Sequence, residues 1–459
     1  MHLKIRKYAH HMCLFLLSLY LLYLIMSISN DSIDELVQYG VQVRKICSSC
    51  QEEEKFGTIV DKDNLGYCKG AYGRDATVSG LMVVPINDRG IKFGAMASNI
   101  WSHVTSAATC NIPSAFNVNK ANPTNVDINA LVPLLLGTTG SASIAPDNMG
   151  YGSSFNYFKG YLHKTQYQTS SMPLWLKARR LVAEETSCRS EIGKEVVING
   201  YSEGGYGAVS IAEAMESFGT RIIKLTAGGG PYKTSSAVIT EGYKDVTSGK
   251  YPDYLRFYFP LVAQAYSSTY RGIENYNTGQ DLLADSWVSN DDKRYKKRDA
   301  IGITTDLGGA NRLNKLVPTP MGENSLSIWN QDFIRFIDEA ANDGIKKPCE
   351  NQARINQASR DGRPVNRLCE ALLANDLSDY INSISYPYNL CHSRDDEVVP
   401  VENVQEENDF MSALIQVPGD HNEAGLMCIQ EAVTFFVSFT YMYVIYVFLV
   451  NKSLLTRLS

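Results

Sequence analysis

The sequence predicts an α/β fold in which helices flank both faces of a mostly parallel central sheet and a helical cap is inserted. Two observations support this prediction. Short apolar runs typical of buried strands alternate with helical patterns from residue 76 onward. The alternation stops between about 232 and 383, where one helical pattern follows another.

The chain is long and apolar enough to bury a large core. Its 459 residues are 44% hydrophobic and 20% charged, which favours one large domain plus an insertion. The formal net charge is -6 and no basic stripe is sustained along the chain, so nucleic acid is not the expected partner.

The first 29 residues have the pattern of a targeting signal. Lys4, Arg6 and Lys7 precede a long apolar run, and the small residues Ser27 and Ser29 suit a cleavage site. We therefore expect a signal peptide over 1–29, or an uncleaved signal anchor because the run is long. Either places the main domain in the secretory pathway, on the luminal or extracellular side.

A second charge-free apolar run occupies residues 432–450. Lys452 and Arg457 follow it in a short tail over 451–459, a placement typical of the cytosolic end of a membrane span. The run predicts a possible C-terminal membrane segment and membrane association. A buried final helix and a faulty gene model are the alternatives.

The cysteines fit an oxidising compartment. Removal of the signal peptide takes away Cys13 and leaves nine, most of which we expect to pair. Cys47 and Cys50 are better explained by a disulfide knot with Cys68 than by a redox pair. No HxxxH or paired CxxC supplies clustered zinc ligands, so no metal site is predicted.

The core divides into a first part over 30–231 and a second part over 384–431. An amphipathic lead-in opens the first part. The predicted elements are a strand over 76–86, a helix and a short strand within 131–146, a glycine-rich loop over 147–154, a strand over 195–200, a helix over 203–218, a strand over 222–230, strands within 385–400 and 412–421, and a helix from about Glu423.

Residues 232–383 form the predicted helical cap. Tyr254, Phe257, Leu261 and Ala265 recur at helical intervals, and a second helical pattern ends at Gly344. The cap is also rich in aromatic side chains that could shield an acyl chain, although ordinary helix packing needs such residues too. These aromatic residues are Tyr251, Tyr254, Phe257, Tyr258 and Phe259.

The stretch Gly200-Tyr201-Ser202-Glu203-Gly204 carries the clearest chemical signal. It joins a buried strand to a helix of small residues, and such a turn exposes a serine hydroxyl only if the residues two before and two after it are small. The Lys-Ser/Thr ending of a phosphate loop is absent. Ser202 is therefore a candidate nucleophile.

A serine nucleophile needs a histidine as base and a carboxylate that orients the histidine. On this architecture the order along the chain is serine, acid, histidine. His421 alone among the histidines lies beyond every late strand, so it is the expected base. Asp395, Asp396 and Glu397 all follow the preceding strand, and spacing does not choose among them.

The segments NGYSEGGYGA, APDNMGYGSS, DDEVVP and PGDHNEAG together resemble the α/β-hydrolase superfamily, specifically its secreted lipase and esterase branch with a helical cap before the acid. The resemblance covers roughly 79–436. It implies Ser202 as nucleophile, His421 as base and Asp396 as acid, because relatives place the aspartate four residues before the equivalent of Pro400. It implies no cofactor.

The resemblance also implies an oxyanion hole. One donor is the backbone N–H of Glu203, and the second comes from a loop after an early strand, at Val104 or Thr105. Val104 stands where relatives often have glycine, so the second donor departs from the family pattern. Asp147 and Gly150 to Gly152 match a loop near the active-site mouth, in a structural role.

The sequence thus predicts a serine hydrolase of carboxylic esters, with lipid-like or other apolar esters as small-molecule substrates. Two alternatives stay open. One is a catalytically weak or silent hydrolase fold that is tethered to a membrane and binds a ligand or partner. The other is a serine peptidase of the same fold.

Overall fold

The computed structural model describes most of the core and part of the predicted cap. The described residues are 41–49, 76–85, 95–106, 111–116, 128–138, 140–155, 157, 159–184, 191–269, 326–327, 329–362, 365–405 and 413–435. The signal segment 1–29, residues 436–450 of the apolar run and the tail 451–459 lie outside them, as do Cys50 and Cys68 of the proposed knot.

A single sheet of eight strands runs through the described part of the chain, in the order β1-β2-β4-β3-β5-β6-β7-β8. The β1–β2 and β2–β4 pairs are antiparallel, and all the others are parallel. The strands are β1 (Val41–Ser49), β2 (Thr77–Pro85), β3 (Ala95–Ser102), β4 (Ala142–Pro146), β5 (Glu191–Tyr201), β6 (Arg221–Gly228), β7 (Tyr388–Ser393) and β8 (Leu414–Val417).

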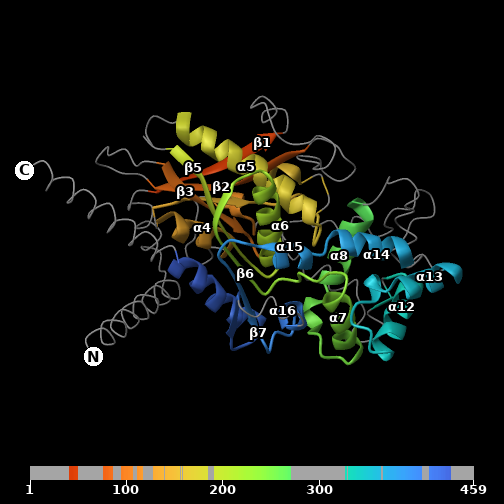
Figure 1. Ribbon diagram of the computed structural model, residues 1–459. Coiled ribbons are helices and arrows are strands. Elements are labelled where there is room, and N and C mark those ends of the chain that lie inside the picture. The colour runs from red at the N-terminus through yellow and green to blue at the C-terminus, as the bar shows by residue number, and fades with distance from the viewer. Residues whose placement is uncertain are drawn as a thin grey trace, which may run out of the picture.

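Helices cover both faces of this sheet (Figure 1). On one face α5 (Lys164–Glu184) and α6 (Glu203–Ser217) pack against residues such as Ile100 and Ile198. On the other face α4 (Ile128–Thr138) and the C-terminal helix, residues 421–435, pack against Val83 and Val197. The mostly parallel, doubly covered sheet predicted from the sequence is therefore present.

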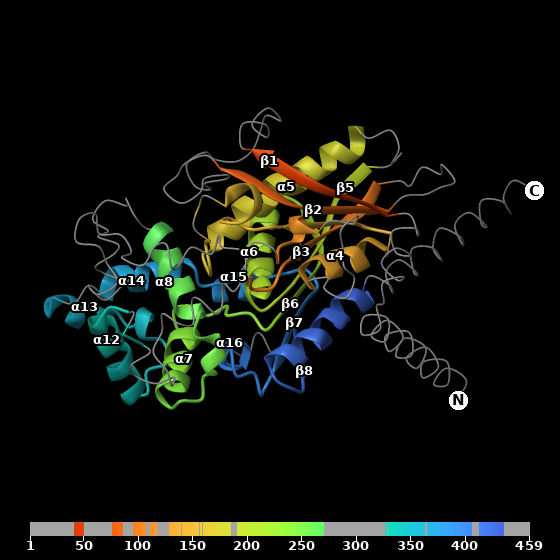
Figure 2. The same ribbon diagram turned by 180° about the vertical axis from the view of Figure 1, so that it is seen from behind.

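The described residues between β6 and β7 fold into helices, and we call the segment 229–387 the insertion. Its helices are α7 (Ala237–Thr247), α8 (Tyr258–Thr269), α12 (Gln331–Asn342), α13 (Gln352–Arg360), α14 (Val365–Ala374) and α15 (Ser378–Ser383). Figures 1 and 2 show all of these except α15 grouped at one end of the molecule, away from β1, while α15 lies beside α6. A short helix, α16 (Glu402–Gln405), follows β7.

Two details of the insertion differ from the sequence pattern. Phe257, Leu261 and Ala265 are buried as the helical spacing predicts, but Tyr254 is 57% exposed. The reason is that α8 begins only at Tyr258, while Tyr254 lies in the separate 3₁₀ turn Asp253–Leu255. Tyr254 is therefore not part of the buried face of α8.

The C-terminal helix runs past the boundary that the sequence suggested at residue 431. Its described part reaches residue 435. Val433 is buried in the same cluster as Ala424 and Ile429, and Ala432 is buried as well. No helix within the described residues has the length and apolar character that a membrane span requires.

Within the part of the chain that the structure describes, two disulfides link separate segments. Cys349 is bonded to Cys369 within the insertion, and Cys391 at the end of β7 is bonded to Cys428 in the C-terminal helix. The second bond joins the two elements that carry the candidate acid and the candidate base.

Candidate active site

The turn between β5 and α6 holds Ser202 in a strained conformation. Its φ of 57° and ψ of -125° lie in a region that side chains rarely occupy, and its N–H donates to Gly228 O at 2.8 Å. A Cβ on Gly200 would lie 2.0 Å from Gly204 O, and one on Gly204 would lie 2.1 Å from Ser102 O. The two glycines are therefore required by close backbone contact, as the sequence pattern predicts.

The structure brings Ser202, His421 and Asp396 together from the ends of β5, β8 and β7. His421 Nε2 lies 2.8 Å from Ser202 Oγ, and His421 Nδ1 lies 2.7 Å from Asp396 Oδ2. Because a carboxylate only accepts, Nδ1 carries the proton and donates to Asp396, which leaves Nε2 free to accept from the serine hydroxyl. A chain of this kind can take the proton from a serine as it attacks.

Of the three acidic residues that spacing left open, only Asp396 contacts the imidazole of His421. Glu397 instead accepts the backbone N–H of His421 at 3.0 Å, and the backbone N–H of Asp395 donates to Ser393 Oγ. Asp396 Oδ1 accepts the backbone N–H groups of Val398 and Val399 at 3.0 and 2.8 Å. The carboxylate is thus fixed at both oxygens.

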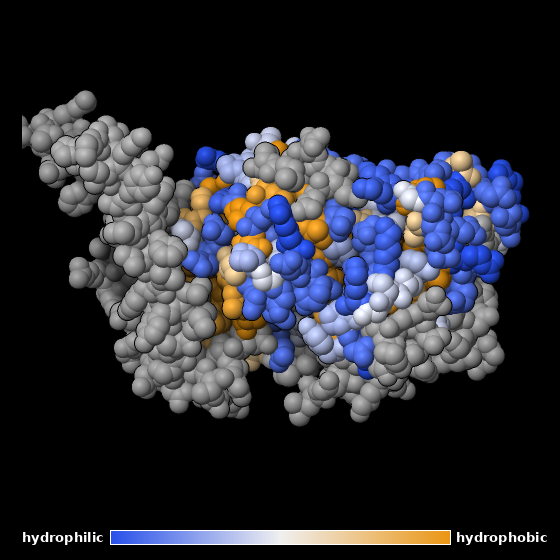
Figure 3. Space-filling view, turned by 90° about the horizontal axis from the view of Figure 1, so that it is seen from below, coloured by the Kyte–Doolittle hydropathy of each residue, from blue (hydrophilic) through white to orange (hydrophobic). Residues whose placement is uncertain are grey.

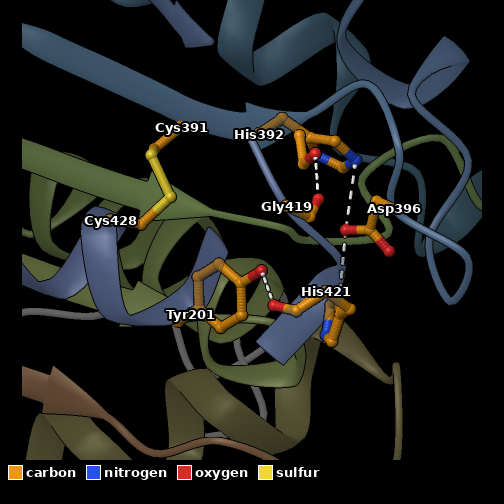
Figure 4. The surroundings of a disulfide bond; sticks show 8 residues. Tyr201, Cys391, His392, Asp396, Gly419, His421 and Cys428 are labelled. Atoms are coloured by element: carbon orange, nitrogen blue, oxygen red, sulfur yellow. Dashed lines mark hydrogen bonds and ion pairs between the residues drawn. A yellow bond between two sulfur atoms is a disulfide. The ribbon is translucent and has the colours of Figure 1, made fainter. Parts of the chain in front are cut away.

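The surroundings of Asp396 keep it ionised. Burial by itself would raise the pKa of Asp396, but the hydrogen bond and charge of His421, together with His392 and the Val399 N–H, lower it below the usual value. His392 lies behind the carboxylate (Figure 4), with Nε2 at 3.5 Å from Asp396 Oδ2 and donating to Val399 O at 3.0 Å. Burial lowers the pKa of His392, against the opposing effect of the Asp396 charge.

Tyr201 supports the backbone of the base. Its hydroxyl donates to His421 O at 2.5 Å, and the two rings lie 5.1 Å apart (Figure 4). No sequence pattern predicted a role for Tyr201 or His392. Their positions immediately before Ser202 and immediately after Cys391 are the only signals that could have suggested one.

The loop after β3 lies against the nucleophile turn, since Ser102 O and His103 O are the atoms that a Cβ on Gly204 would strike. The Val104 N–H donates to Asn129 Oδ1 at 3.0 Å, while His103 Nδ1 donates to Val104 O at 2.7 Å. Both polar groups of Val104 are therefore occupied. The next N–H along the loop is that of Thr105.

Glu203 and Lys159 form a buried ion pair beside this loop, which the sequence analysis did not anticipate. Lys159 Nζ lies 2.6 Å from Glu203 Oε2, and the two side chains are 1% and 0% exposed. Asp147, which the resemblance placed in a structural role, accepts from Ser79 Oγ and from the Ser114 N–H. These hydrogen bonds of Asp147 do not involve Ser202, His421 or Asp396.

Ser202 opens into a pocket between the sheet and the insertion. The pocket encloses about 1230 Å³, its mouth included, and apart from Ser202, Thr234 and tyrosine hydroxyls its lining side chains are apolar. The outer surface at the insertion's end of the molecule is mainly hydrophilic (Figure 3). The lining comes from α7, α8, α12, α14, the loop after β7 and the segment before α5. It includes Tyr161, Val238, Tyr258, Val262, Phe333, Ile334, Leu368, Leu372 and Val399.

Among the described residues, no group of three or more His, Cys, Asp and Glu side chains is arranged to hold a metal ion.

The chain is similar in structure to known hydrolases. A proposed hydrolase of Legionella pneumophila superposes with a TM-score of 0.61 and 16% identity, over 90% of this chain and 95% of that one. The rice cell wall degrading esterase LipA of Xanthomonas oryzae gives 0.56 and 17%, over 89% and 94%. No family model matches the sequence, and no curated protein matches it. The chain has the α/β-hydrolase fold.

Proposed function

We propose that the protein is a serine hydrolase that cleaves carboxylic esters through an acyl-enzyme. The observation that carries this proposal is the unbroken chain from Asp396 through His421 to Ser202, at 2.7 and 2.8 Å. Ser202 Oγ attacks the ester carbonyl while His421 takes its proton and then gives it to the leaving alcohol. A water molecule, deprotonated by His421, then releases the acid and frees Ser202.

The oxyanion hole is proposed to form from two backbone donors. The first is the N–H of Glu203, which opens α6, so the positive end of the helix dipole adds to it. The second is the N–H of Thr105, because the N–H of Val104 is already donated to Asn129. The loss of one such donor typically costs about 3 kcal/mol of transition-state stabilisation.

The pocket supports an ester with a long apolar acyl chain. An acyl group attached to Ser202 would enter a space lined almost wholly by apolar side chains, and burial of each CH₂ there gains about 0.8 kcal/mol. The esterase activity named for LipA of Xanthomonas oryzae supports the ester class. The two disulfides support maturation in an oxidising compartment, as the secretory signal suggests.

A series of p-nitrophenyl esters tests the proposal. We expect kcat/KM of the purified protein to rise from the acetyl ester toward medium and long acyl chains, as each added CH₂ is buried. Ser202→Ala should lower kcat by on the order of 10⁵-fold. Ser210→Ala is the matched control, since Ser210 is buried in α6 and donates only to Tyr206 O.

Three outcomes separate the candidates. Activity on short esters alone would reject the apolar substrate, and cleavage of peptides in preference to esters would favour the peptidase alternative. Saturable binding of a fatty acid without turnover of any ester would support the silent fold instead.

A further inference from the structure

The ammonium group of Lys159 lies between the two chain segments that border Ser202. Its Nζ donates to Glu203 Oε2 at 2.6 Å and to the backbone carbonyl of Ser106 at 3.2 Å. Glu203 follows Ser202 directly, and Ser106 follows Thr105 in the loop after β3. A single buried cation thus connects the nucleophile turn with the neighbouring loop.

Aromatic groups enclose this cation and its carboxylate partner. The Tyr167 hydroxyl donates to Glu203 Oε1 at 2.8 Å, and the Tyr151 hydroxyl donates to Ser106 O. Lys159 Nζ lies 5.1 Å and 4.9 Å from the ring centres of Tyr151 and Tyr161, within the range of a cation–π contact. Both oxygens of the carboxylate are hydrogen-bonded, so the group is held in one orientation.

Stability alone does not explain a pair of this kind. Burial lowers the pKa of Lys159, and the charge of Glu203 only opposes that effect, which shows that removing the ammonium from water is costly. Apolar side chains of similar size often stabilise a core as well as a buried ion pair does. The pair also links two backbone segments through directional hydrogen bonds, and apolar side chains could not do this.

We propose that Lys159 is a positioning residue that sets the distance between the two halves of the oxyanion hole. The proposal rests on the proposed esterase function, in which the N–H groups of Glu203 and Thr105 bind the oxyanion. Lys159 holds the side chain of Glu203, the first donor residue, and the backbone carbonyl of Ser106, the residue that follows the second donor residue Thr105. A displacement of about 1 Å at such donors can cost on the order of a hundredfold in rate.

An alkyl trifluoromethyl ketone tests this geometry directly. Ser202 Oγ adds to the ketone carbon, its proton passes to His421, and the ketone oxygen becomes an oxyanion that needs both donors. The matching alkyl methyl carbinol fills the same pocket without forming an oxyanion. The ratio of the two inhibition constants therefore reports on the oxyanion hole and not on the pocket.

The main variant is Lys159→Met combined with Glu203→Gln, which removes the cation without leaving an unpaired buried carboxylate. We expect its kcat and its affinity for the trifluoromethyl ketone to fall roughly tenfold to a hundredfold. KM and the affinity for the carbinol should stay within about twofold of wild type. Lys159→Arg keeps the charge and should recover part of the loss.

The control is Lys164→Met combined with Glu213→Gln. This pair joins α5 and α6 at 3.1 Å, in the same layer of the molecule, but it is partly exposed and contacts neither border of Ser202. We expect no selective change in trifluoromethyl ketone affinity. If the main variant does not fold, Tyr167→Phe removes the hydroxyl that donates to Glu203 and accepts the Leu162 N–H. It should give the same selective loss of trifluoromethyl ketone affinity, roughly threefold to tenfold, while the affinity for the carbinol reports any change in the pocket at Leu162.

The outcomes are distinct. A folded main variant, or Tyr167→Phe, that keeps its trifluoromethyl ketone affinity overturns the role of Lys159, as does an equal loss of ketone and carbinol affinity. If the wild-type protein binds the carbinol but neither forms the adduct with the trifluoromethyl ketone nor turns over esters, the hydrolase proposal is refuted. The positioning role of Lys159, which rests on it, is then refuted as well.

Discussion

Gly204 has no room for a methyl group. A Cβ there would lie 2.1 Å from Ser102 O and 2.7 Å from His103 O, which are backbone atoms that cannot move aside cheaply. We expect Gly204→Ala to lower the free energy of unfolding by roughly 1 to 3 kcal/mol, measured by urea denaturation, and to reduce kcat. Gly242→Ala is the control, because a Cβ there meets nothing within 4 Å. Equal stability of the two variants would contradict the close packing of the turn.

The ionisation of Asp396 makes stability depend on pH. Its pKa in the folded protein lies below the unfolded value, so the unfolded chain binds more protons as the pH falls. The stabilisation by Asp396 is thus fully present above the unfolded pKa, near 4, and is lost as the pH falls through the lower folded pKa. The stability difference between wild type and Asp396→Asn should be larger at pH 6 than at pH 3. A difference that is independent of pH would argue against a paired carboxylate.

The positions of single residues in the candidate site were predictable where they depend on chain order. Ser202 and His421 could be identified from the strands that precede them, and Asp396 from the resemblance. The ion pair of Lys159 with Glu203 could not, because it joins residues 44 positions apart and no spacing rule links a lysine to a nucleophile turn. The donation of the Val104 N–H to Asn129 likewise depends on how α4 packs beside β3.

At the scale of elements, the disulfide between Cys391 and Cys428 joins β7 to the helix that begins at His421 (Figure 4). Chain-entropy arguments assign roughly 3 to 4 kcal/mol to a loop of this size. We expect a double change to serine to lower both the thermal midpoint and kcat, because acid and base lose a common support. Replacing Cys349 and Cys369 should lower stability without changing kcat on short esters. A similar kcat for both double variants would refute the positional role.

The α7 helix forms one wall of the pocket, and Gly242 lies in that wall with free space beside it. Gly242→Leu should shift the preferred acyl chain to shorter lengths, since it adds a side chain where the chain would lie. Lys244→Leu adds the same side chain to the same helix outside the pocket and should leave the profile unchanged. The chain-length series of kcat/KM measures both. An unshifted profile in Gly242→Leu would place the acyl chain elsewhere.

Most strands of the sheet were predictable from apolar runs. The strand β1 and the helix α5 were not, and each has a physical reason. The strand β1 pairs along nine residues with β2, but as an edge strand it lacks a continuous apolar run. The helix α5 contains glutamine and serine side chains in its buried part, and some of them hydrogen-bond to α6 or to the backbone of α5 itself. Gln168, for example, donates to Ser210 O and Glu213, while Ser170 donates to Gln166 O.

At the scale of the whole molecule, the candidate site depends on the shared direction of the parallel strands. β5, β7 and β8 all end at one edge of the sheet, so residues 202, 396 and 421 meet there although more than 190 positions separate the first two. The insertion between β6 and β7 then covers that edge and supplies an apolar pocket. This assembly was predictable in outline from the order of elements, whereas the shape of the pocket needed the structure.

The most direct test is the site of covalent reaction with an alkyl fluorophosphonate. We predict that one equivalent reacts with the purified protein and that mass mapping of the digested adduct finds the phosphonyl group on Ser202, with loss of the reaction in Ser202→Ala and its retention in Ser210→Ala. A folded protein that does not react, or that carries the adduct on another residue, would contradict the account.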